Sequence, residues 1–287
     1  LINRFINQFG YDETLKLLEA NNNLGYETIR VNRLKTTREE MLKKFSNSNP
    51  GKLSDILYVD SVREFLHSSD IKNGLITFQD EAPALVAHLL KPKEGEEILD
   101  ICAAPGGKTT HIAELTNDKA KITAMELYEH RGELIRQTAK RLGVNSINIK
   151  IGDATEFVPE FENKFDKIVA DVPCSGLGVI RKKPDIKLRV KEEDINEINK
   201  VQKAILKNAS LYLKPGGVLL YSTCTILSEE NEETVKWFLN ENKDFSICTD
   251  ESIIPSEWRS GINDGMLLLL PNKHNSDGFF ICCLKKE

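Results

Sequence analysis

The sequence predicts an α/β protein in which a doubly wound, mostly parallel sheet follows a small α+β module. From about residue 97 onward, short apolar runs alternate with helical patterns, which is typical of repeated βα units. Before that point, a strand, a helix and a second strand follow one another between residues 26 and 59. We therefore divide the chain into an N-terminal part, residues 1–75, and a sheet domain, residues 76–287.

The N-terminal part is expected to begin with helices and to continue as the small module. Its elements are one or two short helices over 1–20 broken near Gly10, a strand over 26–34, a helix after Thr37 and a strand over 56–59. The helix begins at a capping box, because Thr37 is followed three residues later by Glu40. Basic side chains of this module suit a phosphate backbone, although a solvated surface explains them at least as well: Arg30, Arg33, Lys35, Arg38, Lys43 and Lys44.

The sheet domain is expected to follow a helix that starts after Asp80. Its strands are predicted at 97–101, 120–125, 147–151, 166–170 and 218–223, and its main helices at 108–116, 128–142, 192–213 and 229–240. A turn at 215–217 should lead into the last of these strands. A closing pair, 265–270 and 278–284, suggests an antiparallel edge hairpin. The longest helix should bury a periodic stripe: Ile195, Ile198, Val201, Ile205 and Leu213.

A turn of small residues follows the first strand of the sheet domain. It consists of Cys102, Ala103, Ala104, Pro105, Gly106 and Gly107, and a helix opens at about Lys108. A strand that breaks into a glycine turn and continues as a helix lets backbone N–H groups approach a ligand closely. The spacing is neither the dinucleotide fingerprint nor the P-loop. For this stretch alone, an ordinary βα turn is the alternative.

Acidic residues end the next two strands, at the sheet edge where ligands bind in such folds. Glu126 lies about 20 residues beyond the glycine turn, where an acid typically accepts hydrogen bonds from ribose hydroxyls. Asp153 follows the third strand, and an acid there suits an exocyclic amine such as that of adenine. Three successive strands end in polar residues, which favours a nucleoside pocket. The alternative is that Glu126 only interacts with the dipole of the helix that follows it.

Two cysteines follow the fourth and fifth strands. Asp171 and Cys174 belong to an Asp-x-Pro-Cys turn, which places a carboxylate beside a reacting centre and aims the backbone at a flat, flipped base. Free cysteine is usually a buried small hydrophobe, and we interpret Cys282 and Cys283 in this way. Cys174 and Cys224 differ, because they are expected at neighbouring strand ends beside the pocket.

Composition excludes several classes of protein. No apolar run reaches the ~18 residues of a membrane span. The six cysteines form no C-x-x-C pair, and no histidine stands at metal-ligand spacing, so neither a disulfide framework nor a metal site is expected. Reduced thiols indicate a cytoplasmic protein. The net charge of −5 argues against indiscriminate coating of nucleic acid but permits a local basic site.

Several motifs in a fixed order carry a family resemblance. They are QDEAP before the first strand, DICAAPGGKTTH at the glycine turn, DVPCSGLGVIRKKPDIK, YSTCTILSEEN, and SDGFF near the end. In these motifs the chain closely resembles the RNA 5-methylcytosine methyltransferases of the RsmB/Sun/NSUN type, particularly the bacterial members that modify 16S ribosomal RNA. The resemblance covers essentially the whole chain and is most specific over 79–284. It implies a Rossmann-like class I S-adenosylmethionine-dependent methyltransferase with an RRM- or ferredoxin-like RNA-binding module in 1–75.

The resemblance also implies how the cofactor binds. S-adenosylmethionine is expected at residues 102–108, with Glu126 on the ribose and Asp153 near the adenine. Asp171 is expected near both the methyl donor and the target base. Glu126 departs from the aspartate that is common at its position, a change that keeps the carboxylate.

The implied reaction explains why thiols are needed. Carbon 5 of cytosine is a poor nucleophile, whereas a thiolate that adds to carbon 6 makes carbon 5 enamine-like. The resemblance implies Cys224 as this nucleophile and Cys174 as the residue that assists release of the methylated RNA. An acid near ring nitrogen 3 stabilises the charge that builds up, and a base then removes the carbon 5 proton.

A basic run follows the Cys174 motif and is a candidate contact for RNA phosphates. Its members are Arg181, Lys182, Lys183, Lys187, Arg189 and Lys191, interrupted by one acid, Asp185. A charge run of this kind is more often a solvated face. Its place directly after the cysteine motif favours RNA contact.

Three other interpretations stay open at this point. The first is a DNA cytosine-5 methyltransferase that uses Cys174, although the Thr223-Cys224 strand end favours RNA. The second is an exocyclic-amine methyltransferase, but Cys174 stands where an aromatic residue would stack on the base. The third is a non-catalytic RNA-binding or assembly factor, which the intact cofactor loop and both cysteines disfavour.

The chain begins within an amphipathic helix and without an initiator Met, which we interpret as a fragment of a longer protein. Bacterial family members often carry a NusB-like helical domain in front. We expect a monomer whose partner is RNA, with no membrane or metal involved. Ribosomal RNA is the expected substrate, and transfer RNA is the alternative.

Overall fold

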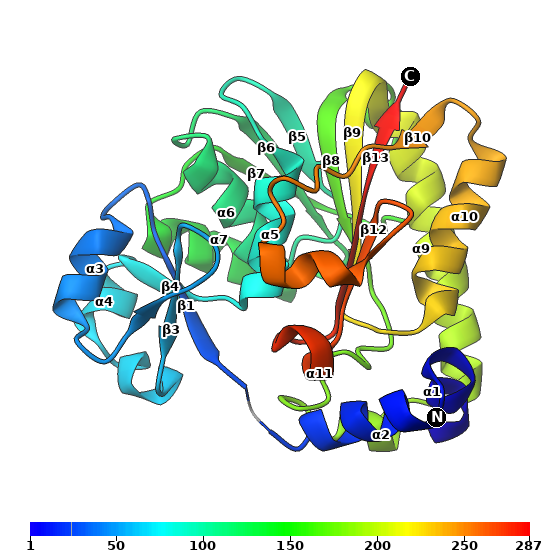
Figure 1. The fold of residues 1–287 in the computed structure, drawn as a ribbon. Helices are drawn as coiled ribbons and strands as arrows, with labels where there is room; N and C mark the ends of the chain where they lie inside the picture. Colours follow the sequence, from blue (N-terminus) through cyan, green and yellow to red (C-terminus); the bar gives the residue numbers. More distant parts are fainter. Residues whose placement is uncertain (24) are drawn as a thin grey trace.

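The structure is a computed structural model that describes residues 1–23 and 25–287 (Figure 1). Within these residues it contains a four-stranded antiparallel sheet near the N-terminus and a nine-stranded mixed sheet. The expected α/β class with a small additional module is confirmed, but the large sheet is mixed rather than mostly parallel, because four of its eight strand pairings are antiparallel.

The small sheet has the strand order β2-β3-β1-β4, and every neighbouring pair is antiparallel. Its elements are β1 (Glu27–Val31), α3 (Arg38–Lys44), β2 (Asn49–Pro50), β3 (Ile56–Val59), the 3-10 turn η1 (Val62–Phe65), α4 (Ser69–Lys72) and β4 (Ile76–Phe78). The expected capping box opens α3, because the Thr37 hydroxyl accepts from the Glu40 N–H and the Glu40 carboxylate accepts from the Thr37 N–H.

The first 78 residues are not one unit. β4 pairs with β1 through Ile29↔Phe78, so the small sheet extends beyond the expected boundary at residue 75. Gly10 separates α1 (Ile2–Phe9) from α2 (Tyr11–Ala20) as expected, and its φ of 80° suits glycine. These two helices contact the sheet domain rather than the small sheet, because their apolar side chains are buried there in a cluster with Leu177, Ile180, Ile195, Ile226, Leu227 and Leu270.

The large sheet has the order β11-β12-β13-β9-β8-β5-β6-β7, and β10 pairs with the end of β13. The strands from β9 to β7 are parallel, whereas β13 runs antiparallel to β9 and β12. The expected closing pair is therefore present, although β13 lies inside the sheet. The strands are β5 (Glu97–Asp100), β6 (Lys121–Glu126), β7 (Ile147–Ile151), β8 (Phe165–Asp171), β9 (Leu213–Thr223), β10 (Phe245–Ile247), β11 (Ile262–Asn263), β12 (Met266–Leu269) and β13 (Phe279–Lys286).

Helices cover both faces of this sheet (Figure 1). α5 (Glu81–Leu90), α6 (Gly107–Leu115) and α7 (Glu129–Leu142) share one apolar core, and α9 (Glu192–Tyr212) and α10 (Glu232–Glu241) share another on the opposite face. The remaining short helical elements are η2 (Pro159–Phe161), α8 (Ile186–Arg189), η3 (Ser228–Glu230), η4 (Ser256–Gly261) and α11 (Pro271–His274). No helix in the described part of the chain combines the length and the apolar character needed to cross a membrane.

Details of α9 and β9 differ from the sequence expectation. Leu213 begins β9 instead of ending the helix, and residues 215–217 form an irregularity within the strand rather than a turn before it. Gly216 has a φ of 78°, which only glycine adopts readily. Val201 was expected to be buried but is 37% exposed, because this side of α9 faces the open pocket described below.

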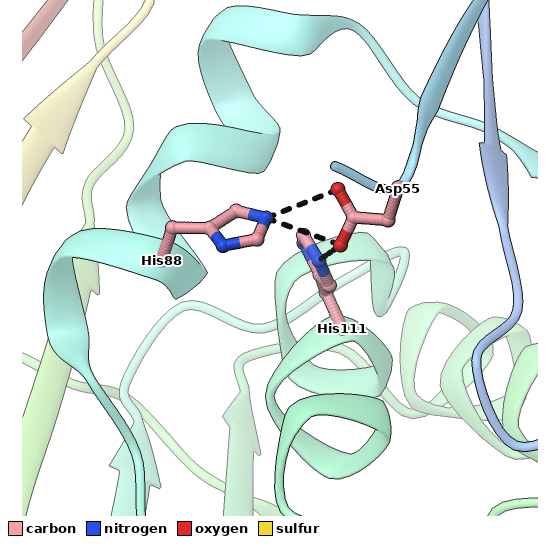
Figure 2. A group of neighbouring side chains, drawn as sticks. All are labelled: Asp55, His88 and His111. Carbon is pink, nitrogen blue, oxygen red and sulfur yellow. Dashed lines mark hydrogen bonds and ion pairs between the residues drawn. The ribbon is translucent and has the colours of Figure 1, made fainter. Parts of the chain in front are cut away.

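A buried polar group joins the small module to the sheet domain, and we call it the seam cluster. Its members are Arg30, Asp55, His88, His111 and Glu114. Figure 2 shows both imidazole rings pointing to the Asp55 carboxylate, with Nε2 of His111 2.7 Å and Nε2 of His88 3.0 Å from its oxygens. Arg30 pairs with Glu114 at 2.8 Å, and neither side chain is exposed. Arg30 is thus a structural cation rather than part of a phosphate-binding face.

The seam cluster contacts the helix that follows the glycine turn. Arg30 donates to the Gly107 carbonyl at 2.8 Å and to the Thr110 hydroxyl at 3.1 Å, so the small module braces the first turn of α6. Burial and the neighbouring Arg30 lower the pKa of His111 to about 3. The ring is therefore neutral near pH 7, and its Nε2–H donates to Asp55.

Candidate active site

A pocket of ≈ 380 Å³ lies at the carboxyl ends of the parallel strands, where ligands bind in open α/β sheets. Seven of the residues singled out in the sequence line it: Cys102, Ala104, Glu126, Asp153, Asp171, Cys174 and Cys224. They come together because parallel strands end at one edge of a sheet. The pocket also has apolar lining from Ile101, Leu127, Val172, Val201 and Ile205.

The glycine turn forms one wall of the pocket. Gly106 has a φ of 97°, and a Cβ there would approach Ile135 to 3.3 Å, so a larger residue would disturb the packing of α7. Ala103 is buried against Ala124 and Ile135, and its N–H donates to the Met125 carbonyl at 2.9 Å. Of residues 102–108, Cys102 and Ala104 reach the pocket, whereas Ala103, Pro105, Gly106 and Gly107 shape the turn.

Glu126 ends β6 with its carboxylate nearly buried at the pocket wall. It accepts hydrogen bonds from the Ala104 and Tyr128 N–H groups, each at 3.3 Å, and lies 3.4 Å from the Arg131 guanidinium. These contacts hold the carboxylate between the glycine turn and the start of α7. An acceptor held in this place suits a diol such as that of ribose.

Asp153 lies on the turn after β7. Its Oδ1 accepts from both the N–H and the hydroxyl of Thr155, at 2.8 and 2.7 Å. These bonds make an Asx turn, which fixes the carboxylate in the pocket wall. The second oxygen is not used by this turn and is the one that a ligand amine would meet.

Asp171, which lines the pocket, forms an ion pair with Lys108. The Lys108 Nζ donates to one carboxylate oxygen at 2.7 Å, and the Ser222 hydroxyl donates to the other at 2.7 Å. Burial alone would lower the pKa of Lys108, but the Asp171 carboxylate beside it outweighs this and raises the pKa. Lys108 is therefore a permanent cation that points from the first turn of α6 towards the strand ends.

The Cys174 and Cys224 side chains are in contact, with their Sγ atoms 3.2 Å apart. Both are free thiols. A hydrogen bond from Cys174 lowers the pKa of Cys224, and the Lys108 and Lys183 ammonium groups act in the same direction against burial. The same hydrogen bond, together with burial, raises the pKa of Cys174. These opposite shifts favour Cys224 as the more acidic thiol of the pair and Cys174 as the donor of the hydrogen bond between them.

The other cysteines differ from this pair. Cys282 and Cys283 are buried within β13, as the sequence analysis assumed, and burial raises the pKa of both thiols. Cys102 lines the pocket, but burial and nearby carboxylates raise its pKa as well. None of these three has a neighbouring thiol donor among the described hydrogen bonds.

The basic run after Cys174 divides into buried and exposed members. Arg181 is buried in an ion pair with Asp277, and Lys182 is paired with Asp80 and Asp277. These two cations anchor the loop to the chain and are not presented to a phosphate. Lys183 and Lys187 are exposed. Of the four residues predicted to contact RNA, only these two can therefore meet a phosphate.

The sequence analysis missed a network of polar side chains beneath the two cysteines, which we call the anchor network: Ser175, Gln202, Thr225, Glu230 and Asn231. Glu230 and Asn231 are in the quoted YSTCTILSEEN motif, so the motif was the available signal. Nothing in the local pattern identified Ser175 or Gln202 as their partners, because Gln202 lies 28 residues from Glu230 on another helix.

The histidines also come together in a way that sequence spacing did not show. Asp55, His88 and His111 place their donor atoms within 4.8 Å of one another, although no metal-ligand spacing is visible in the sequence. The group has the composition of a metal site. However, the carboxylate already accepts from both rings, and the Arg30 charge beside His111 opposes a further cation. The geometry favours a hydrogen-bonded structural role.

Comparisons with known proteins agree with this arrangement. A family model described as 16S rRNA methyltransferase RsmB/F matches residues 87–285, and one described as an RsmF/B-like ferredoxin-like domain matches residues 1–50. The chain is 37% identical to a probable ribosomal RNA small subunit methyltransferase B from Bacillus subtilis (strain 168), over 100% of the chain and 66% of the relative. It is 36% identical to the protein of the same description from Synechocystis sp., again over 100% of the chain and 66% of the relative. The chain thus spans slightly less than two thirds of the length of these relatives.

Solved structures share the fold over almost the whole chain. The crystal structure of PH0851 has a TM-score of 0.92 at 35% identity, and the match covers 99% of this chain and 65% of the PH0851 chain. The structure of NSun6 from Pyrococcus horikoshii with SFG has a TM-score of 0.88 at 25% identity and covers 100% of this chain and 97% of its own. The likeness therefore includes the small module as well as the large sheet.

Proposed function

Because the chain belongs to the RsmB/F family of 16S rRNA methyltransferases, we propose that it transfers a methyl group from S-adenosylmethionine to carbon 5 of a cytosine in 16S ribosomal RNA. The reaction passes through a covalent bond between Cys224 and the base. The observation that carries this proposal is the thiol pair, Cys224 beside Cys174 at 3.2 Å, in a pocket lined also by Asp171, whose carboxylate is paired with Lys108.

The pocket fits an adenosyl cofactor. Glu126 offers a fixed carboxylate to the ribose hydroxyls, and Asp153 offers a free oxygen to the adenine amine. Ile101 and Leu127 supply apolar lining for a flat ring. The pocket volume of ≈ 380 Å³ lies within the range of small-molecule sites. When bound, S-adenosylmethionine supplies an electrophilic methyl group.

Cys224 begins the reaction as the nucleophile. Its thiolate adds to carbon 6 of the cytosine, which makes carbon 5 nucleophilic towards the methyl group. A base then removes the carbon 5 proton, the electron pair reforms the double bond, and the thiolate leaves. Cys174 is placed to return a proton to this thiolate, in keeping with a role in releasing the methylated RNA.

Asp171 and Lys108 provide fixed charges beside the thiol pair. Asp171 is oriented by Lys108 and Ser222, so it does not reorganise when charge develops on the base. Carrying a proton, its carboxyl group would donate a hydrogen bond to ring nitrogen 3, where the negative charge accumulates. Lys108 stabilises the Cys224 thiolate, which is also the leaving group of the last step.

The RNA backbone is proposed to contact the exposed part of the loop after Cys174. Lys183 is close enough to lower the pKa of Cys224, and Lys187 follows in the short helix α8. A phosphate held there would position the target nucleotide over the thiol pair. Arg181 and Lys182 support this loop from inside through Asp277.

The test uses RNA that contains 5-fluorocytosine, because fluorine blocks the final proton removal and traps the covalent adduct. The wild type, Cys224→Ser and Cys174→Ser are incubated with this RNA and S-adenosylmethionine and are analysed on a denaturing gel. We expect an adduct with the wild type and with Cys174→Ser and none with Cys224→Ser. Cys282→Ser, a cysteine buried in β13, is the matched control and should retain the adduct.

Two other outcomes have definite meanings. An adduct that is lost only with Cys174→Ser would assign the chain to the DNA-type mechanism. Absence of any adduct would contradict the covalent mechanism for this chain with that RNA. Repeating the reaction with 16S ribosomal RNA fragments and with transfer RNA distinguishes the two substrate classes.

A further inference from the structure

Glu230 is a fully buried carboxylate directly beneath the thiol pair. It lies in η3, six residues beyond Cys224, and its side chain has no exposed surface. A carboxylate is rarely buried in this way unless it is fully hydrogen-bonded. Glu230 contacts neither thiol directly in the described hydrogen bonds, so its partners indicate what it does.

Glu230 holds the turn that carries Cys174. Its Oε2 accepts from the Ser175 N–H at 2.9 Å and from Gln202 Nε2 at 3.0 Å, and its Oε1 accepts from the Ser175 hydroxyl. Gln202 Nε2 also donates to the Pro173 carbonyl at 3.0 Å. The residues immediately before and after Cys174 are therefore both connected to the same carboxylate.

Glu230 also holds the turn that carries Cys224. The Ser175 and Thr225 hydroxyl oxygens are 2.8 Å apart. Because the Ser175 hydroxyl donates its proton to Glu230, Thr225 must be the donor between the two hydroxyls. Asn231, the next residue after Glu230, donates to the Thr225 carbonyl at 3.0 Å. One chain of hydrogen bonds thus connects Thr225, Ser175 and Glu230 across the two cysteine turns.

The charge of Glu230 acts on the two thiols unequally. All of its side-chain contacts in this network come from donors, which is the pattern of an ionised carboxylate. Burial raises the pKa of Glu230, while these hydrogen bonds oppose the rise. The negative charge in turn raises the pKa of Cys174, in addition to the effects of Cys224 and burial. The largest effects on the pKa of Cys224 come instead from Cys174, from burial, and from the charges of Asp171, Lys108 and Lys183.

We propose that Glu230 is the positioning residue of the thiol pair, which fixes the contact between the two sulfur atoms and keeps Cys174 as the protonated partner. The roles of the two thiols in the reaction rest on the proposed function, whereas the position of Glu230 and its effect on the thiols do not. It assigns different roles to two adjacent acids of one motif, since Glu229 pairs with Arg4 near the surface and Glu230 lies under the reacting atoms.

The first test measures thiol reactivity and needs no RNA. The wild type, Glu230→Gln and the control Glu229→Gln are treated with iodoacetamide across the pH range around the usual thiol pKa. Peptide mass spectrometry then gives separate alkylation rates for Cys174 and Cys224. In the wild type and in Glu229→Gln, Cys224 should react faster at neutral pH. In Glu230→Gln, the ratio of the two rates should fall by about threefold to tenfold, the effect of half to one pKa unit.

The second test uses the 5-fluorocytosine RNA. Glu230→Gln should form the covalent adduct more slowly than the wild type, while its affinity for S-adenosylmethionine stays the same, because Glu230 does not line the pocket. Glu230→Asp shortens the side chain but keeps the charge, and it should restore the alkylation ratio more than the adduct rate. A purely structural role would change all these quantities together with the melting temperature.

The outcomes separate this proposal from the proposed function. An unchanged alkylation ratio and pH profile in Glu230→Gln would overturn the positioning role. A changed ratio without any adduct, in the wild type as well, would keep the positioning role and contradict the covalent mechanism. If Glu230→Gln does not fold, Thr225→Val removes the hydroxyl link to Ser175 together with a long contact from the Leu227 N–H, and leaves Glu230 in place. It should change the ratio in the same direction by less, and no change there would equally overturn the proposal.

Discussion

The helix α6 contributes to two buried ionic groups with different properties. Its first turn supplies Lys108 to the pocket, and its later turns supply His111 and Glu114 to the seam cluster. In the seam cluster, the Arg30 and Glu114 side chains are 0% exposed and pair with each other. In the pocket, the Asp171 side chain is 28% exposed. The thiols beside it are also only partly covered.

This difference shows that residues of one helix, α6, have two roles: those in the seam cluster are structural, and Lys108 beside the pocket takes part in its chemistry. The seam cluster is closed, so its charges hold the small module against α6 and meet no ligand. The pocket pair is open on one side, so its charges are available to a substrate while still strengthened by partial burial.

Replacing Arg30 should affect stability most. Arg30→Met leaves the buried Glu114 carboxylate without its partner, so the free energy of unfolding should fall by about 3–5 kcal/mol. Urea denaturation followed by circular dichroism measures this. The control is Lys121→Met, whose partner Glu97 lies at the surface and whose loss should cost less than about 1 kcal/mol. Equal effects from the two variants would contradict a structural role for the seam cluster.

Replacing Asp171 should instead affect the reaction. Asp171→Asn removes the carboxyl group that is proposed to hydrogen-bond to ring nitrogen 3 of the target base as an acid, so the rate of methyl transfer should fall by about 10²- to 10³-fold. Its loss of stability should be smaller than that of Arg30→Met, because this carboxylate is partly exposed. Asp166→Asn, on the same strand but at its other end, is the control and should retain the rate. Retained activity in Asp171→Asn would remove Asp171 from the mechanism.

Acid should destabilise the seam cluster, because it protonates a histidine that is buried in the neutral form. The His111 pKa of about 3 is below the ordinary 6.5, so the unfolded state binds more protons between these values. Stability should therefore fall as the pH drops below about 6.5, by at most about 1.4 kcal/mol per pH unit. Asp55, whose pKa is lowered by both histidines against burial, adds a further loss only below its ordinary 3.8.

The urea midpoint as a function of pH measures this dependence, and His111→Gln isolates the histidine. The variant should be less stable near pH 7.5 but should show a flatter decline towards pH 5. A decline as steep as that of the wild type would assign the pH dependence to other groups, such as His274, whose pKa is also lowered by burial.

The smallest effect is expected at the exposed lysines. Lys183→Ala and Lys187→Ala should each weaken RNA binding and reduce the slope of log affinity against log salt by about 1. Binding of S-adenosylmethionine and stability should not change. Lys119→Ala is a control at the opposite edge of the sheet, where it pairs with Glu94. An unchanged salt slope would show that the loop after Cys174 does not contact phosphates.

Elements and site residues were predictable to different degrees. The order of strands and helices followed from apolar periodicity, and the α3 capping box followed from two residues three positions apart. The pocket was predictable because carboxyl ends of parallel strands share one edge, which brought Glu126, Asp171 and Cys224 together. Each of these inferences depends on local pattern plus one general rule of topology.

Other features depended on partners that no local pattern specifies. Arg181 was expected to face RNA, but Asp277, 96 residues later, buries it in an ion pair. The strand β4 joined the small sheet beyond the expected boundary, because pairing with β1 is a long-range choice. Val201 followed helical periodicity and still became exposed, because the pocket opens beside it.

The α/β architecture, the glycine turn and the acids and thiols at the strand ends follow from the sequence alone. These are local properties, set by periodicity, by glycine conformation and by the motif order along the chain. Only the tertiary structure decided which charges are enclosed and which are open. It brought Asp55 to two histidines and Glu230 to both cysteine turns, because hydrogen bonds between distant side chains form only after the sheet and its helices have packed.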